Sequence, residues 1–133
     1  MPVLDASVVV DALVAAGRPG DLGRAELSKL SELQVPAIFT AEVASALRSL
    51  VHRRALSPIR AATALTEILS IRTLAYPFEP FARRAWELRD SVTIYDAWYV
   101  ALAERLETEL ITADTRLADA RGPRCPVRYL DPS

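Results

Sequence analysis

Four acidic residues stand where a chain of this kind could carry out chemistry. Asp5 and Asp114 each follow a short apolar run that is typical of a strand, and Glu42 follows a third such run after one short turn. Asp96 lies at the start of an expected helix, and the residues three, four and seven positions after it are apolar. An acid on an apolar flank needs a partner, and no basic residue recurs beside it. The four side chains are therefore candidates for one acidic site.

The elements that must position these acids alternate between strands and helices. Apolar runs bounded by turn residues predict strands at about 2–4, 34–38, 73–76, 110–112 and 126–130. Helical periodicity predicts helices at about 7–16, 24–33, 40–54, 57–71, 81–89, 93–107 and 115–121. Gly17, Pro19 and Gly20 are interpreted as a break, and Thr40 as the N-cap of the helix that carries Glu42. This alternation favours an α/β fold with a mainly parallel sheet, and residues 1–133 are expected to form a single domain.

In a parallel sheet, ligands gather beyond the carboxyl ends of the strands. Asp5, Glu42 and Asp114 should therefore lie along one edge, with Asp96 near them. Clustered carboxylates repel one another unless a cation lies between them, and helix N-termini are expected to lower their pKa values. Oxygen ligands without a nearby His or Cys favour Mg²⁺ or Mn²⁺ over Zn²⁺. We predict that these four acids are the catalytic residues and the metal ligands.

Divalent ions held by carboxylates suit the hydrolysis of a phosphodiester bond, because a bound water becomes a nucleophile and the leaving oxygen is stabilised. The hydroxyls of Ser7 and Thr112 lie two residues after Asp5 and two residues before Asp114, and could orient these groups. Each of these residues also has a simpler interpretation as a helix cap or a first-turn acid. The convergence of four acids at one edge is what favours a site.

Bulk properties narrow the class of protein. The chain has 133 residues and 51% hydrophobic content, which is enough for a core without disulfides or structural metal. Its single cysteine, Cys125, cannot form an internal bridge. Asp5 and Asp11 interrupt the N-terminal apolar run, so no signal peptide is predicted, and no apolar stretch approaches the roughly 20 residues of a membrane span. A cytoplasmic protein without a membrane partner is expected.

Four segments in order resemble the PIN domain. They are VLDASVVVDAL, TAEVASALR, YDAWYVALAERL and LITADTRLADA, and they cover nearly the whole chain. More narrowly, they resemble the VapC-type toxin ribonucleases of bacterial toxin–antitoxin pairs. Through this likeness Asp5, Glu42, Asp96 and Asp114 match the metal-binding acids of the family, Ser7 its small hydroxyl residue and Thr112 the Thr of its T-x-D motif.

The resemblance implies a three-layer α/β/α sandwich with a central five-stranded sheet in the order 3-2-1-4-5. It also implies an endoribonuclease that depends on Mg²⁺ or Mn²⁺, acts on RNA and forms a homodimer. A small cognate antitoxin would block the acidic site. A partner groove is expected within residues 23–71, where three consecutive helices with apolar faces offer more apolar surface than the sheet can cover.

Other polar and aromatic residues are weaker candidates for contacts with RNA. Arg116 follows Asp114 closely and is the best candidate for a phosphate contact, whereas Arg53 and the other arginines are interpreted mainly as solvated helix surface. Trp98 and Tyr99 could stack on a base, but Trp98 fits the buried face of its helix better.

Three other functions compete with a nuclease. A catalytically silent binding module with the same fold would act through a protein or RNA partner, and the presence of all four acids argues against it. A receiver domain phosphorylated on Asp needs a Lys near the pocket, and Lys29 lies in a peripheral helix. A phosphatase of the haloacid-dehalogenase type would have Asp at position 7, which is Ser7 here.

Overall fold

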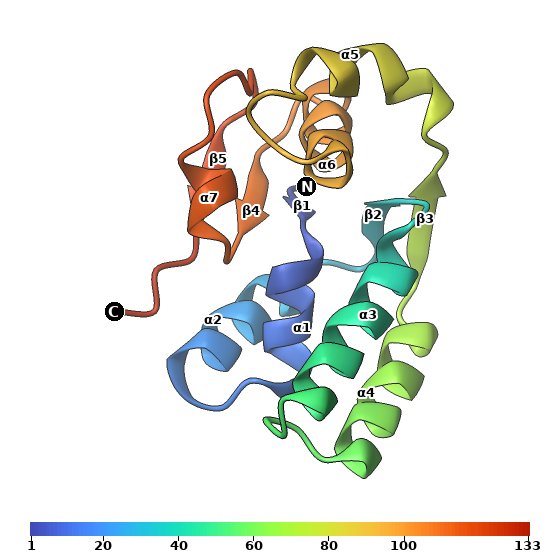
Figure 1. Cartoon of the computed structure of the whole chain (residues 1–133), viewed down its shortest axis with the longest axis vertical. Coiled ribbons are helices and arrows are strands. Elements are labelled where there is room, and N and C mark those ends of the chain that lie inside the picture. Colours follow the sequence, from blue (N-terminus) through green and yellow to red (C-terminus); the bar gives the residue numbers. More distant parts are fainter.

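Short parallel strands lie at the centre of the computed structural model, which describes all 133 residues (Figure 1). β1 (Val3–Leu4) pairs with β4 (Leu110–Thr112), and β4 pairs with β5 (Val127–Tyr129). β2 (Leu33–Pro36) and β3 (Thr73–Tyr76) form a second parallel pair. The prediction of an α/β fold with parallel strands is therefore confirmed.

The predicted five-stranded sheet is not present as one hydrogen-bonded unit. Figure 1 shows β1 between β4 and β2, and β1 contacts β2, but the two strands share no ladder. β1 has two residues, and the N–H groups of Val3 and Asp5 on either side of Leu4 bond to the chain around β4, at Glu109 and Ile111. So short a strand does not ladder on both sides. The order 3-2-1-4-5 and the three-layer sandwich remain predictions.

Helices surround these strands. They are α1 (Ala6–Val14), α2 (Gly17–Ser28), α3 (Phe39–His52), α4 (Pro58–Ser70), α5 (Ala82–Glu87), α6 (Ile94–Arg105) and α7 (Thr115–Ala118), with a short 3₁₀ turn, η1 (Glu79–Phe81). The predicted bounds of α4 are correct within one residue, because Ser57 caps it and Pro58 occupies its first position. No helix in the structure has the length and apolar character needed to cross a membrane.

The interpretation of Gly17, Pro19 and Gly20 as a break was wrong. All three belong to α2, and Pro19 lies in its first turn, where a backbone N–H has no partner within the helix. Gly23 allows the close contact between α2 and α1, because a Cβ at this position would lie 2.8 Å from the carbonyl oxygen of Val8. The predicted end at Leu33 was also wrong, since this residue begins β2.

The N-cap predicted at Thr40 was also wrong, because α3 begins one residue earlier, at Phe39, with Ile38 as its cap. Phe39 is fully buried and fixes this end of the helix in the core. Glu42 still falls in the first turn, as predicted.

Helix α6 runs through the interior. One hydrophobic core of 27 buried residues joins the two strand groups, and seven consecutive residues of α6, from Ala97 to Ala103, are buried. A helix buried on nearly every side has little freedom to shift. Asp96, in the first turn of α6, is therefore held in a fixed place relative to both strand groups.

Candidate active site

Asp5 is the most firmly held of the four acids. It lies between β1 and α1, where its extended backbone makes it the N-cap, and its Oδ1 accepts the Val8 N–H at 3.3 Å. Ser7 donates its hydroxyl to the same oxygen, and Thr112 donates to Oδ2 at 2.6 Å. The residue is 5% exposed. These hydrogen bonds fix one orientation of the carboxylate.

Ser7 and Thr112 connect Asp5 to the loop that carries Asp114. The Ser7 hydroxyl accepts the Ala113 N–H at 3.0 Å, and the Thr112 hydroxyl accepts the Asp114 N–H at 2.9 Å. Each hydroxyl thus donates to Asp5 and accepts from the backbone after β4. The contacts expected of these two supporting residues are present, and they set the position of Asp114 relative to Asp5.

Glu42 reaches the site from the first turn of α3 and is bound by a residue of α6. The Tyr99 hydroxyl donates to Glu42 Oε1 at 2.7 Å. Tyr99 is 1% exposed, so this side chain cannot stack on a base as was considered from the sequence. It instead joins α6 to α3 inside the core.

Asp96 and Asp114 both lie at helix N-termini. The Thr93 hydroxyl caps α6 by accepting the Asp96 N–H at 3.1 Å, and Asp114 caps α7 by accepting the Arg116 N–H at 2.9 Å. The simpler interpretation of Asp5 and Asp114 as caps is therefore correct, yet it does not exclude a site. Arg116 forms an ion pair with Asp114 at 3.5 Å, and its side chain is 92% exposed.

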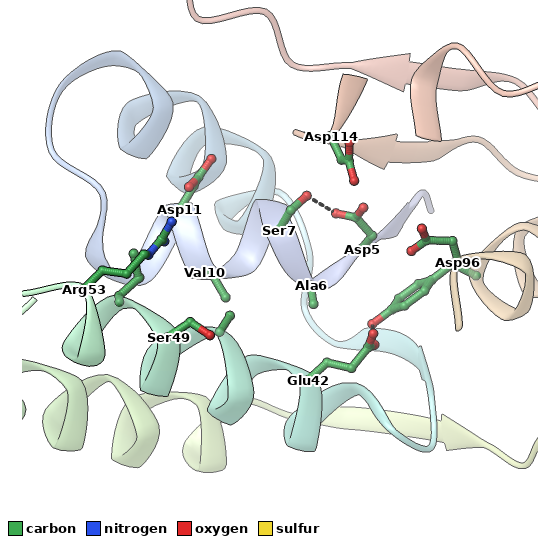
Figure 2. A pocket seen from close by; sticks show the side chains of 13 residues that line it. Asp5, Ala6, Ser7, Val10, Asp11, Glu42, Ser49, Arg53, Asp96 and Asp114 are labelled. Carbon is green, nitrogen blue, oxygen red and sulfur yellow. Dashed lines mark hydrogen bonds between the residues drawn. The ribbon is translucent and has the colours of Figure 1, made fainter. Parts of the chain in front are cut away.

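The structure brings all four predicted acids to one cavity of about 650 Å³. In Figure 2 the carboxylates of Asp5, Asp96 and Asp114 face one another, and Glu42 approaches from α3. They come from four separate parts of the chain, which meet because the strands are parallel and the helices begin at one edge of the strands. Ser7 also lines this cavity, whereas Arg116 does not.

Burial raises the pKa of three of these acids. The pKa of Asp5 rises to about 6, because loss of water outweighs its hydrogen bonds and the charge of Asp96 adds repulsion. The pKa values of Glu42 and Asp96 are raised as well, first by burial and then by neighbouring carboxylates. The expectation that helix N-termini would lower the pKa values was wrong, because in this cavity desolvation and like charge exceed the helix dipole.

The chemistry of the donor atoms fits a hard divalent cation. The acidic end of the cavity offers carboxylate oxygens, while His52 lies elsewhere, in a groove between α3 and α4, and Cys125 contacts the backbone of Val100. No group of three or more acidic, histidine or cysteine side chains is arranged to hold a metal ion as it stands. The carboxylates therefore form a suitable donor set, and closure around an ion requires their side chains to rotate toward it.

Several residues of this cavity were not predicted as site residues. Tyr99 was considered only for base stacking, and Asp11 and Arg53 were interpreted as an interruption of an apolar run and as solvated surface. The spacing of Arg53 eleven positions after Glu42 could have revealed that both lie on one face of α3, since that is about three helical turns. Trp98 is 7% exposed and packs edge-on against Phe78, so its predicted place in the core is confirmed.

Comparison with known proteins assigns the fold and the family. The PIN domain family model matches residues 3–123. Ribonuclease VapC9 of Mycobacterium tuberculosis is 39% identical over 127 residues, with 96% of each chain covered. Ribonuclease VapC1 of the same organism is 40% identical over 129 residues, again with 96% of each chain covered.

Solved structures share the fold. PAE2754 from Pyrobaculum aerophilum superposes with a TM-score of 0.62 at 25% identity, covering 88% of this chain and 85% of its own. FitAcB from Neisseria gonorrhoeae superposes with a TM-score of 0.67 at 21% identity over 98% of both chains. On the family match and the close identity to these relatives, the chain belongs to the PIN domain family, among its VapC-type members.

Proposed function

We propose that this chain is the toxin of a toxin–antitoxin pair and an endoribonuclease that hydrolyses phosphodiester bonds of RNA in the cytoplasm. The observation that carries the proposal is the convergence of Asp5, Glu42, Asp96 and Asp114 on one cavity. The names of the VapC ribonucleases at 39–40% identity over 96% of this chain support the same activity. A silent binding module is less well supported, because it has no need for four acids whose burial and mutual repulsion disfavour their charged forms.

We further propose that the activity depends on Mg²⁺ or Mn²⁺. The four acids would hold the ion, which when bound would supply an activated water and stabilise the leaving oxygen. The raised pKa values of Asp5, Glu42 and Asp96 support this, because a cation between them relieves the repulsion that raises them.

Within this scheme the chain has three tasks of its own. Ser7 and Thr112 keep the Asp5 carboxylate in one orientation by donating to its two oxygens. Tyr99 holds one oxygen of Glu42 and leaves the other free to face the cavity. The exposed guanidinium of Arg116 at the Asp114 side remains the candidate for an RNA phosphate contact there.

Cleavage assays test this proposal. A mixed-sequence RNA is incubated with the purified chain in Mn²⁺ and in EDTA, and the same comparison is made for Asp96→Asn and for Asp119→Asn. Asp119 is an exposed acid at the end of α7 and serves as the matched control. We expect cleavage by the wild type and Asp119→Asn in Mn²⁺ and a loss of about 100-fold or more in Asp96→Asn. Equal cleavage by Asp96→Asn would remove that residue from the proposed site, and cleavage in EDTA would contradict metal dependence.

The antitoxin is proposed to dock on the groove between α3 and α4. This groove has a volume of about 280 Å³, and its apolar lining includes Leu47, Val51 and Leu65. Leu65→Ala should weaken antitoxin binding without affecting RNA cleavage, as measured by calorimetry with the cognate antitoxin. Unchanged affinity would count against this surface.

A homodimer is also proposed from the family resemblance. Large apolar side chains remain exposed on the helical side of the molecule, with Ile59 82% and Leu69 68% exposed on α4. Apolar surface of this kind commonly marks a protein interface. Light scattering of the purified chain should report twice the mass of one chain, and a monomer at micromolar concentration would contradict the proposal.

A further inference from the structure

The cavity that contains the four acids does not end at them. Beyond the acids it continues as a groove between α1 and α3, which lie side by side. Figure 2 shows Arg53 and Asp11 at the end of this groove, with Ser49 and Val10 between them and the acids. The α1–α3 groove therefore leads away from the proposed site of cleavage.

The α3 side of the groove follows the helical repeat. Glu42, Ala46, Ser49, Leu50 and Arg53 line it, at spacings of four, three, one and three residues, which places them on one face. Eleven residues at 1.5 Å each separate Glu42 from Arg53 by about 16 Å along the helix axis. The acidic end and the basic end of the cavity are thus about three helical turns apart.

Arg53 is the only Lys or Arg side chain that lines the cavity, and it makes no hydrogen bond or ion pair within the chain. Arg24, Arg60, Arg84 and Arg128, by contrast, are occupied by carboxylates or backbone carbonyls. The hydroxyl of Ser49, one helical turn before Arg53, is also unpaired, because no hydrogen bond of the chain engages it. A cation and a hydroxyl one turn apart are the groups that bind a phosphate.

The groove floor suits the rest of a nucleotide. Val10, Ala46 and Leu50 give it an apolar surface on which a sugar or base edge can rest. Asp11 lies on the α1 side and is half-buried, and its carboxylate repels phosphate from that wall. A phosphate in the groove would therefore lie on the α3 side, next to Arg53, and the Asp11 oxygens would accept from a ribose hydroxyl or a base amino group.

We infer that the α1–α3 groove is a subsite for the RNA strand beyond the scissile bond, in which Arg53 and Ser49 hold a backbone phosphate more than one nucleotide from the four acids. This inference rests on the proposed ribonuclease activity. An RNA that is cut at the acids must continue past them, and its next phosphates are repelled by the acids and attracted by the one free cation of the cavity.

Salt-dependent binding tests the subsite apart from catalysis. A fluorescein-labelled, mixed-sequence single-stranded RNA is titrated in EDTA against the wild type, Arg53→Gln, Arg53→Lys and Arg48→Gln. Arg48 is exposed on the same helix but lines the α3–α4 groove instead, so it is the matched control. We expect Arg53→Gln to raise Kd about tenfold at low salt. Its slope of log K against log salt should shrink by about 0.7, the value for one lost phosphate contact on a single strand, while Arg53→Lys keeps most of the slope.

Cleavage kinetics in Mn²⁺ separate this inference from the proposed function. Arg53→Gln should raise KM on long RNA and leave kcat nearly unchanged, and it should cut an RNA too short to reach Arg53 as well as the wild type does. If Arg53→Gln and Arg48→Gln match the wild type in Kd, slope and KM while the wild type cleaves, the subsite is wrong and the ribonuclease stands. If the wild type neither binds nor cleaves RNA, the proposed function fails and the subsite fails with it.

Discussion

The Tyr99 hydroxyl donates a 2.7 Å hydrogen bond to Glu42 across the interface of α6 and α3. It is the one contact inside the chain that fixes the orientation of the Glu42 carboxylate, since the other acids are held through caps and hydroxyls of their own. Burial raises the pKa of Tyr99, so the phenol remains protonated and continues to donate at neutral pH. Tyr99 is therefore a positioning residue for Glu42.

Tyr99→Phe keeps the ring and removes this donor. The variant should lose about 1 kcal/mol of stability, and its RNA cleavage should fall about tenfold because Glu42 is no longer oriented. The Mn²⁺ concentration needed for half-maximal thermal stabilisation should rise as well, which a purely structural loss would not cause. Tyr95→Phe is the control, because Tyr95 lies on the same helix with its side chain 53% exposed. Equal effects of the two variants would contradict the role of Tyr99.

The acidic cavity should make the metal-free chain less stable as pH rises. The pKa values of Asp5, Glu42 and Asp96 are raised in the folded state, so their contribution is fully present below the unfolded values near 4 and is lost as pH rises through the folded values, about 6 for Asp5. Asp96→Asn removes one of the repelling charges. In EDTA at pH 7.5 it should be about 1 kcal/mol more stable than the wild type.

Urea unfolding in EDTA at pH 7.5 and at pH 4 measures this difference. The gain from Asp96→Asn should shrink at pH 4, where the carboxylates are protonated in both proteins. A variant that is less stable than the wild type at pH 7.5 would show that Asp96 is mainly a structural residue of the α6 N-terminus.

A second pH effect of opposite sign comes from Glu26, which is 7% exposed on α2 and bonds to Arg128 on β5 at 2.9 Å. The hydrogen bond from Arg128 lowers the pKa of Glu26 below its usual value of 4.5. The stabilisation is thus present above the unfolded pKa and is lost as pH falls through the folded pKa. Arg128→Met should cost about 2 kcal/mol at pH 7, because the Glu26 carboxylate remains with Lys29 alone, and less at pH 3.5.

Chemical denaturation at the two pH values checks this ion pair. Arg121→Met serves as the control, since Arg121 is exposed and forms no ion pair in the chain. A pH-independent loss in Arg128→Met would show that the packing of its aliphatic stem, and not its charge, holds β5 to α2.

The contact between α1 and α2 should be sensitive to a single methyl group. A Cβ at Gly23 would lie 2.8 Å from the Val8 carbonyl oxygen and 2.9 Å from the Ala12 nitrogen, both of which are backbone atoms that cannot move aside freely. Gly23→Ala should therefore lower the free energy of unfolding by about 1–3 kcal/mol. A thermal melt measures the loss, and a gain in stability, as expected for Gly to Ala in an open helix, would contradict the close packing.

Much of this architecture can be predicted from the sequence, because local signals and tertiary packing agree. Ser57-Pro58 marks the start of α4, and Thr73–Tyr76 coincides with β3. The prediction fails where packing decides instead. Gly20 and Gly23 lower helix propensity, yet they are helical because their lack of a side chain lets α2 contact the chain around α1.

The candidate site was predictable to a different degree for each residue. Asp5, Glu42 and Asp114 come after strands, and a parallel arrangement brings the carboxyl ends of these strands to one edge. Tyr99 was not recognised, because its hydrogen bond partner lies 57 residues away and the nearly continuous burial of α6 gives no polar face to interpret. The break between β1 and β2 also has no local signal, since it depends on the length of β1 and on its pairing with β4.

Anomalous diffraction from crystals grown with Mn²⁺ tests the central claim most directly, because it locates the ion without assuming any activity. We predict a peak in the acidic cavity at about 2.1 Å from oxygens of at least two of Asp5, Glu42, Asp96 and Asp114, as octahedral oxygen ligation requires. A well-ordered cavity without a peak at millimolar Mn²⁺, or a peak held elsewhere in the molecule, would contradict the claim.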